Sequence, residues 1–276
     1  MSVWFVTGAS RGFGAEIVAQ ALAAGHQVVG TARDPGSVTA QFPDAGDQLL
    51  AVALDVTDEA AARAAVAAAV ERFGRIDVVV NNAGRGLLSA VEEASDSAVR
   101  GVYDANVFGV LNVLRAVLPR LRAQRSGHII NLSSVGGFAS SAGWGIYCST
   151  KFALEGISEA LAGEVGPLGI SVTIVEPGYF RTDFLDASSL HTEFNEIADY
   201  AATAGATRAH AVSANHNQPG DPVKAVAAIL QLGATEKPPL RIQLGSDSVA
   251  VVAGKLKSVA AEQEAWRELS VSTDFD

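Results

Sequence analysis

Short, continuously apolar runs alternate along the chain with longer alanine-rich stretches. The short runs are rich in β-branched residues and end in turn residues, which is typical of strands buried on both faces of a sheet. This pattern predicts strands at Val3–Thr7, Gln27–Thr31, Leu49–Leu54, Ile76–Val80, His128–Leu132, Ser171–Val175 and Leu240–Leu244.

The longer stretches carry apolar residues at helical spacing. In one of them Val66, Val70 and Phe73 fall on a single face, and Thr57 or Asp58 is the expected N-cap. Helices are predicted at Ala15–Ala24, Asp58–Phe73, Ser97–Leu121, Ile146–Val165, Asp221–Leu232 and around Ser248–Leu269.

Strand and helix alternation favours right-handed crossovers and a parallel sheet. We therefore predict an α/β fold, a Rossmann-type doubly wound parallel sheet of about seven strands in the order 3-2-1-4-5-6-7, with helices on both faces. Residues 1–276 are expected to form a single domain. Residues 182–218 break the alternation and are predicted to form a partly helical substrate flap, followed later by a C-terminal extension at 245–276 that contains the last helix.

Composition excludes several classes of protein. A hydrophobic fraction of 49% allows a large core, and a net charge of -10 disfavours nucleic acid or an anionic membrane as the main partner. No uninterrupted apolar run approaches the roughly 18 residues that cross a bilayer, and no basic secretion signal is evident, so a cytoplasmic protein is expected. With one cysteine and scattered histidines, we expect no disulfide and no metal site.

The first expected strand leads through a glycine-rich turn into a helix. Such a turn can be merely a tight connection, but at the first strand of an alternating chain it favours a dinucleotide whose pyrophosphate sits at the helix N-terminus. The expected contacts from this turn are Gly8, Ser10, Arg11, Gly12, Phe13 and Gly14.

The second strand ends at Ala32-Arg33, where an NAD enzyme usually carries an acid that holds the ribose. A guanidinium at Arg33 can bind a 2′-phosphate, and Arg11 could close on the same group. Alternatively both arginines are solvated surface residues, and Asp34 would serve a ribose hydroxyl if the strand end is misplaced. We favour NADP(H) over NAD(H).

Polar and small residues also follow the third and fourth strands, at the edge where open α/β sheets bind ligands. Asp55, beside Val56, could accept a hydrogen bond from the adenine amino group or simply cap the next helix. Asn82, Ala83 and Gly84 are expected to contact the cofactor, although a plain turn would look similar.

Tyr147 and Lys151 are spaced i, i+4 and share one helix face. A nearby ammonium lowers a tyrosine pKa, and a phenol tuned in this way can exchange a proton with a carbonyl oxygen. Ser134 closes the fifth strand and brings a hydroxyl to the same sheet edge. Asn106 interrupts a long helix, where asparagine is a poor helix former, so it marks a kink or a water site, or is a tolerated polar residue.

In combination these motifs resemble the single-domain short-chain dehydrogenase/reductase family. Thr7–Gly14 matches its T-G-x-x-x-G-x-G loop, and Asn81–Gly84 matches its N-N-A-G element. The similarity to the family spans roughly residues 2–185. Within it, the sequence segments 31–34, 82–88 and 147–156 are similar to the 17β-hydroxysteroid dehydrogenase-like branch, which commonly prefers NADP(H). The remaining matches are the tetrad Asn106, Ser134, Tyr147 and Lys151, and the P-G-x-x-x-T turn formed by Pro177, Gly178 and Thr182.

The resemblance implies an NADP(H)-dependent oxidoreductase, either a ketone or carbonyl reductase or a secondary-alcohol dehydrogenase (EC 1.1.1.-). Tyr147 would be the general acid/base, Lys151 would lower its pKa and hold the nicotinamide ribose, and Ser134 would orient the carbonyl oxygen. Asn106 would hold a relay water. Pro177, Gly178, Phe180 and Thr182 would contact the nicotinamide. Alternatives are a non-catalytic NADP(H) sensor and an epimerase that retains its cofactor.

Aromatic and apolar residues gather around the tetrad and in the flap, including Phe180, Leu185, Leu190 and Phe194. They either line a pocket for a bulky apolar ketone or alcohol, or form the core of the flap. Cys148 is expected to point away from Tyr147 and to pack. By family analogy the helices around the fifth strand make a homodimer or homotetramer. The expected substrate contacts are Ser134, Gly136, Phe138, Trp144, Tyr147, Tyr179 and Phe184.

Overall fold

The computed structural model describes residues 1–192 and 195–275. Its centre is a seven-stranded, fully parallel sheet in the order β3-β2-β1-β4-β6-β7-β9. Counted among themselves, these strands run 3-2-1-4-5-6-7, so the predicted fold class and strand order are confirmed. The strands are β1 (Val3–Thr7), β2 (Gln27–Ala32), β3 (Leu49–Ala53), β4 (Val78–Asn81), β6 (Gly127–Leu132), β7 (Ile170–Pro177) and β9 (Arg241–Leu244).

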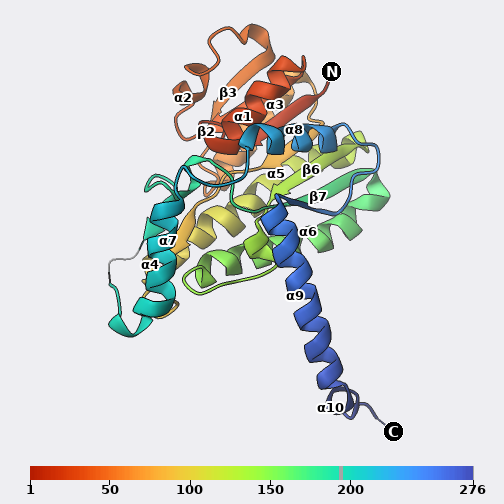
Figure 1. Ribbon diagram of the computed structural model, residues 1–276. Coiled ribbons are helices and arrows are strands. Elements are labelled where there is room, and N and C mark those ends of the chain that lie inside the picture. The colour runs from red at the N-terminus through yellow and green to blue at the C-terminus, as the bar shows by residue number, and fades with distance from the viewer. Residues whose placement is uncertain (193–194, 276) are drawn as a thin grey trace.

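Helices cover both faces of the sheet (Figure 1). One layer contains α1 and α8, and the other contains α3, α5 and α6. The α-helices are α1 (Gly12–Ala23), α2 (Gly36–Thr39), α3 (Glu59–Phe73), α4 (Asp96–Tyr103), α5 (Gly109–Gln124), α6 (Gly145–Val165), α7 (Ala206–Ala214), α8 (Pro222–Gly233), α9 (Ser246–Ala265) and α10 (Arg267–Val271).

The first strand shows why its sequence is apolar without interruption. Successive side chains of a strand point to opposite faces of the sheet. Val3 and Phe5 enter the core under α3, α5 and α6, whereas Trp4 and Val6 enter the core under α1 and α8. Since both faces are covered, neither face leaves room for the polar residues of a half-exposed strand.

The helix predicted at 97–121 is a longer helical run from 96 to 124 that contains one π-helical turn, η2 (Asp104–Phe108). Asn106 lies in that turn, so the irregularity expected at this residue is confirmed. By length and composition the run is apolar enough to cross a membrane, but half of its apolar window is buried. It contacts α3 and α6 and serves here as a core helix.

The segment predicted as a flap contains several short elements and one strand that the sequence pattern did not reveal. Strand β8 (Leu190–Thr192) pairs in parallel with β5 (Gly86–Leu88) to form a separate two-stranded sheet. Phe194, expected among the aromatic residues of the flap, lies outside the described residues. The short helical turns are η1 (Gly46–Gln48), η3 (Val135–Gly137), η4 (Gly166–Leu168), η5 (Asp183–Leu185), η6 (Ala198–Tyr200) and η7 (Ala201–Gly205).

The C-terminal helix expected around Ser248–Leu269 is present as α9 and the short α10. Its first two turns contact the body of the protein, where Ser248 and Val252 are buried. From there α9 projects away from the rest of the molecule, as Figure 1 shows. Every described residue from 253 to 275 is exposed.

Candidate active site

Two adjoining cavities lie where the strands of the main sheet end. The smaller has a volume of about 320 Å³ and the larger about 470 Å³. Ligands of open α/β sheets bind at this edge. Because the two cavities share a wall, molecules bound in them would lie side by side. The residues that line both are Phe13, Asn82, Gly84, Arg85, Thr182 and Phe184.

The glycine-rich turn after β1 forms one wall of the larger cavity. Gly8 and Gly12 have φ angles of +65° and +54°, which favour glycine. A side chain at Gly14 would meet the Gly8 carbonyl oxygen at 2.1 Å, so the turn closes only with glycine there. Ser10, Arg11 and Phe13 also line the cavity with Gly8 and Gly12, whereas Gly14 lies behind the turn.

The turn after β4 is fastened to this glycine-rich turn. The Asn82 side-chain amide donates to the carbonyl oxygens of Thr7 and Gly8 at 2.9 and 3.1 Å. The Thr7 hydroxyl accepts from the backbone amides of Asn82 and Ala83, each at 3.0 Å. Asn82, Ala83 and Gly84 line the larger cavity, and the bonding role of Thr7 was missed by the sequence analysis.

Arg33 and Arg11 both line the larger cavity, but Asp34 does not. Arg33 is exposed at the end of β2. Asp34 turns instead to the backbone amide of Gly36, from which it accepts at 2.9 Å. The Arg11 guanidinium donates to the Ser188 carbonyl oxygen in the flap at 2.7 Å.

Asp55 and Val56, after β3, also line the larger cavity. Asp55 accepts from the backbone amide and the hydroxyl of Thr57 at 3.0 and 2.8 Å. The cap of α3 is Asp58, which accepts from two backbone amides of the first turn. The expected alternative role of Asp55 as a helix cap is therefore wrong, since that role belongs to Asp58.

Tyr147, Ser134 and Lys151 line the smaller cavity together. Tyr147 lies in the first turn of α6, and Lys151 follows one turn later with its Nζ 5.9 Å from the centre of the tyrosine ring. Burial raises the pKa of Tyr147, and a hydrogen bond with the Ser134 side chain opposes that rise. For the chain alone, burial is the largest cause and this pKa lies above its ordinary value, so the expected lowering is not found.

Lys151 is itself buried. Its ammonium group donates to the carbonyl oxygen of Leu132, at the end of β6, at 2.8 Å. Burial lowers the pKa of Lys151 to about 8, and the charge of Glu155 one turn further along α6 opposes that shift. The lysine is consequently poised to gain or lose its proton near neutral pH.

Asn106 joins α6 to the turn after β4. Its side chain donates to the Arg85 carbonyl oxygen at 2.9 Å and to the Thr150 hydroxyl at 3.0 Å, and it accepts from the Arg85 amide at 2.9 Å. Thr150 precedes Lys151, so Asn106 fixes the start of α6 against the cofactor side of the site. Both amide hydrogens of Asn106 are used in these contacts.

The wall of the smaller cavity is mostly apolar and includes most of the predicted substrate contacts. Phe138 is the exception, because it does not line the cavity and instead lies under the Arg241 guanidinium at 5.8 Å. Leu190 belongs to the packed cluster behind the wall. The predicted residues that line the cavity are Ser134, Gly136, Trp144, Tyr147, Tyr179, Phe180, Phe184 and Leu185.

Cys148 also lines this cavity, and it belongs to the packed cluster that contains Trp144 and Tyr147, so the expectation that it packs is confirmed. Its side chain lies against the backbone close to Ser134, since a side chain at Gly136 would meet the Cys148 sulfur at 2.9 Å. Burial raises the pKa of the Cys148 thiol. The residue thus presents a protonated, poorly nucleophilic thiol to the cavity.

The turn after β7 closes the boundary between the cavities. Pro177, Gly178 and Thr182 line it, and the rings of Phe13 and Phe180 meet with centroids 5.4 Å apart. Nicotinamide contacts were predicted for all of these residues except Phe13, which was expected to contact the cofactor from the glycine-rich turn.

The first two turns of α9 contact the turn after β7 and the smaller cavity. Asp247 accepts from the backbone amide of Tyr179 at 2.7 Å, and Val251 lines the smaller cavity. Neither contact was foreseen, because nothing in the sequence pattern brings the C-terminal helix to the site.

Gln218 is a further lining residue that was missed. It lies directly before Pro219-Gly220 and is only 2% exposed. Neither its amide nitrogen nor its amide oxygen has a hydrogen-bond partner among the described residues. Buried amide groups are normally satisfied, so this side chain is suited to a polar group bound in the cavity.

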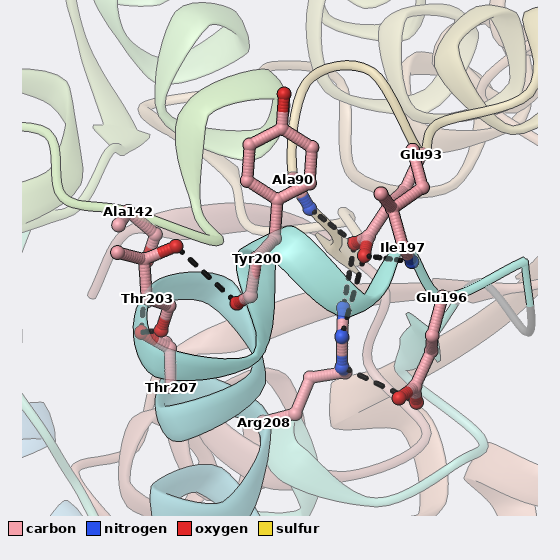
Figure 2. Close-up of polar contacts among 9 residues, drawn as sticks. All are labelled: Ala90, Glu93, Ala142, Glu196, Ile197, Tyr200, Thr203, Thr207 and Arg208. Carbon is pink, nitrogen blue, oxygen red and sulfur yellow. Dashed lines mark hydrogen bonds and ion pairs between the residues drawn. The ribbon is translucent and has the colours of Figure 1, made fainter.

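An ion pair between Glu93 and Arg208, called here the flap anchor, fastens the flap to the segment after β5. Figure 2 shows the polar contacts of both residues. Glu93 accepts from Arg208 at 2.7 Å, from the Ala90 amide at 2.8 Å and from the Ile197 amide at 2.9 Å. Arg208 also reaches Glu196 at 3.4 Å. This flap anchor was not predicted, because its two charges are 115 residues apart in the sequence.

A family model described as short chain dehydrogenase matches residues 2–193. This match covers more than half of the chain. The chain belongs to the short-chain dehydrogenase family.

Three similar proteins align with almost the whole length of this short-chain dehydrogenase. Oxidoreductase BOA17 of Botryotinia fuckeliana is 39% identical over 98% of both chains. The 3-ketodihydrosphingosine reductase of Bacteroides thetaiotaomicron is 40% identical over 92% of this chain and 91% of its own. The crystal structure of a short-chain dehydrogenase from Streptomyces avermitilis has a TM-score of 0.91 and 45% identity, and 99% of each chain is covered.

More distantly similar solved structures share the fold and contain nicotinamide dinucleotides. Solved structures with TM-scores of 0.83, 0.75 and 0.73 contain NAD, NADP and NADH, respectively. Their sequence identities of 22% to 24% support the fold of this dehydrogenase. In the part of the chain that the structure describes, no group of three His, Cys, Asp or Glu side chains is arranged to hold a metal ion.

Proposed function

We propose that this oxidoreductase uses NADP(H) to interconvert a fairly bulky apolar ketone and its secondary alcohol. The observation that carries the proposal is the placement of Tyr147, Ser134 and Lys151 in one buried cavity that shares a wall with a second, glycine-lined cavity. A phenol donor beside such a pair of cavities suits hydride transfer coupled to proton transfer.

In this mechanism the bound NADPH supplies the hydride. Ser134 accepts a hydrogen bond from the Gly136 amide at 3.0 Å and is hydrogen-bonded to Tyr147, so a carbonyl oxygen bound between the two hydroxyls could accept from both. The raised pKa of Tyr147 keeps the phenol protonated at neutral pH, so it can give its proton to the same oxygen during reduction. Lys151 keeps two N–H groups besides the one that it donates to Leu132, and these would hold the nicotinamide ribose.

NADP(H) fits the larger cavity better than NAD(H). Arg33 and Arg11 bring two positive charges to the end of β2, and Asp34 is turned toward Gly36 instead. The glycine-rich turn offers backbone amides to the pyrophosphate. Pro177, Gly178, Phe180 and Thr182 would contact the nicotinamide ring and its carboxamide.

The lining of the smaller cavity supports an apolar substrate that carries a second polar group. Trp144, Tyr179 and Phe184 give the wall its apolar character, and Gln218 would bind a hydroxyl, amide or similar group away from the ketone. The relative named 3-ketodihydrosphingosine reductase gives further support for a keto substrate. A narrower assignment to the 17β-hydroxysteroid dehydrogenase-like branch stays a prediction.

Several expectations belong to the same proposal. We propose a single NAD(P)-binding domain over residues 1–276, with 182–218 as its substrate flap and 245–276 as its extension. A cytoplasmic location and a homodimer or homotetramer are also proposed. Asn106 is proposed as a positioning residue, while its part in a water relay stays a prediction.

The test is a panel of ketones and alcohols with NADPH or NADP⁺, followed at 340 nm, with Tyr147→Phe beside the unchanged enzyme. We expect turnover in the panel and a loss of at least about 100-fold in kcat for Tyr147→Phe, with NADPH binding retained. Tyr103→Phe is the matched control, because Tyr103 bonds Ser149 at 2.9 Å outside both cavities.

Other outcomes separate the alternatives. Undiminished biological activity of Tyr147→Phe would favour a non-catalytic sensor. Conversion of a substrate without any net change of nicotinamide absorbance would favour an epimerase.

A further inference from the structure

Helix α9 carries an apolar stripe that its own molecule leaves uncovered. Val249, Val252, Leu256 and Val259 follow one another at spacings of three, four and three residues, and Gln263 and Trp266 continue the series. This is the a and d spacing of a heptad repeat, which is typical of helices that pair with another helix.

The exposed fractions show where a partner is missing. Val249, Leu256, Val259 and Trp266 are 54%, 55%, 46% and 64% exposed, whereas Val252 is 7% exposed because the body of its own molecule covers it. An apolar stripe of this length on a projecting helix is unusual unless another surface covers it.

We propose that α9 packs antiparallel against α9 of a second copy of this chain. A two-fold axis that passes between residues 257 and 258 puts Leu256 opposite the partner's Val259 and Val249 opposite the partner's Trp266. The same register puts Gln263 opposite the partner's Val252. Gln263, the polar position of the stripe, is thus placed where Val252 is covered by its own molecule and needs no apolar partner from the second copy.

The charges on the helix support this register. Lys255 and Lys257 lie in its first half, while Glu262 and Glu264 lie in its second half. Lys255 and Glu262 both occupy g positions, and in an antiparallel pair g positions of the two helices are neighbours. Two-fold symmetry then forms the pair between Lys255 and the partner's Glu262 twice.

The opposite flank of the stripe allows the two helices to approach closely. Its e positions are Ala253 and Ala260, which would face each other across the pair. A parallel arrangement would instead set Lys255 beside Ala260 and would need Glu262 to reach Arg267. Arg267 lies beyond Trp266, where α9 ends with a change of backbone direction.

The experiment is a cross-linking test on the full-length protein. Leu256→Cys carrying a size tag is mixed with untagged Val259→Cys under mild oxidation, and the disulfide-linked products are separated by mass. We expect the mixed product to exceed both homotypic products several-fold. The matched controls are Lys257→Cys and Ala261→Cys, on the outer face of the pair, and they should give about background yield. Native Cys148 is buried and does not take part.

Charge reversal in the same cysteine background tests the pairing directly. Lys255→Glu and Glu262→Lys should each lower the mixed yield at least about five-fold, and the double variant should restore it. Lys257→Glu and Glu264→Lys, which lie outside the pair, should leave it unchanged. Predominant homotypic products, or no mixed product above the controls, would overturn the proposal, as would a charge reversal that the double variant does not rescue.

Discussion

Glu93 and Arg208 form a buried ion pair that ties α7 of the flap to the segment after β5 (Figure 2). The Glu93 side chain is fully buried and the Arg208 side chain is 10% exposed. Three donors, two of them backbone amides, converge on the carboxylate. The flap is consequently held by one charge cluster whose two charged residues line neither cavity.

Replacing Glu93 by Gln should destabilise the protein, because it removes the buried counter-charge of Arg208 and leaves only the exposed Glu196 nearby. We expect a loss of about 3 kcal/mol in the free energy of unfolding, or a fall in Tm of roughly 5–10 °C. Asp96→Asn, which breaks an exposed pair with Arg100, should cost less than about 0.5 kcal/mol. Equal Tm values for Glu93→Gln and Asp96→Asn would contradict a stabilising role of the flap anchor.

The same pair predicts acid sensitivity of the flap. The hydrogen bond from Arg208, aided by the Ile197 and Ala90 amides, lowers the pKa of Glu93 from 4.5 to about 2. A carboxyl with a lowered folded-state pKa stabilises the protein fully above its unfolded value and loses that contribution as the pH falls toward the folded value. Thermal unfolding should therefore show a stability loss between pH 4.5 and 2 that is absent in Glu93→Gln.

The pKa of Lys151 predicts where the rate of ketone reduction falls on the alkaline side of the pH profile. Since burial lowers the pKa of Lys151 to about 8, its positive charge is present below that pH and is lost above it. The rate of ketone reduction should thus fall as the pH rises through about 8. Glu155 raises the pKa of Lys151, so Glu155→Gln should move this fall in rate to lower pH. If the fall in rate stays at the same pH in Glu155→Gln, a group other than Lys151 causes it.

The position of Arg33 in the larger cavity predicts a preference for NADPH over NADH. Arg33→Ala should raise the KM for NADPH by about 10- to 100-fold, as expected for a lost hydrogen bond to a charged group worth ~1.5–3 kcal/mol, and should leave the KM for NADH nearly unchanged. Asp34→Ala is the control, because Asp34 lies outside the cavity. A parallel change for both cofactors would remove the case for a 2′-phosphate site.

Gln218 predicts substrate selectivity. Gln218→Leu should raise the KM by roughly 10-fold for ketones with a second polar group, because the polar partner in the cavity is lost. Purely apolar ketones should bind as well or better, since the buried amide no longer needs a partner. Identical changes across both sets of ketones would show that Gln218 does not contact the substrate.

The fold was largely predictable because its main sheet is buried on both faces. Strands such as Val3–Thr7 must then be apolar throughout, and that pattern is visible in the sequence. The pairing of β5 with β8 was not predictable, because two three-residue strands carry no periodic signal and depend on tertiary contacts.

The candidate site was predictable where its residues follow strand ends, as Ser134 does, or share a helix face, as Tyr147 and Lys151 do. Residues that reach the site through long-range packing were missed, including Gln218 and Asp247. Phe138 was misplaced, because the direction of a side chain after a strand is set by neighbours from other elements.

The contact between Arg11 and the Ser188 carbonyl oxygen implies an order of events during turnover. A phosphate is a stronger acceptor than a backbone carbonyl, so an arriving dinucleotide would draw Arg11 away and release one tether of the flap. We expect a compulsory sequence in which the nucleotide enters first and leaves last. Product-inhibition kinetics should then show NADP⁺ competing with NADPH alone, and random patterns would argue against the sequence.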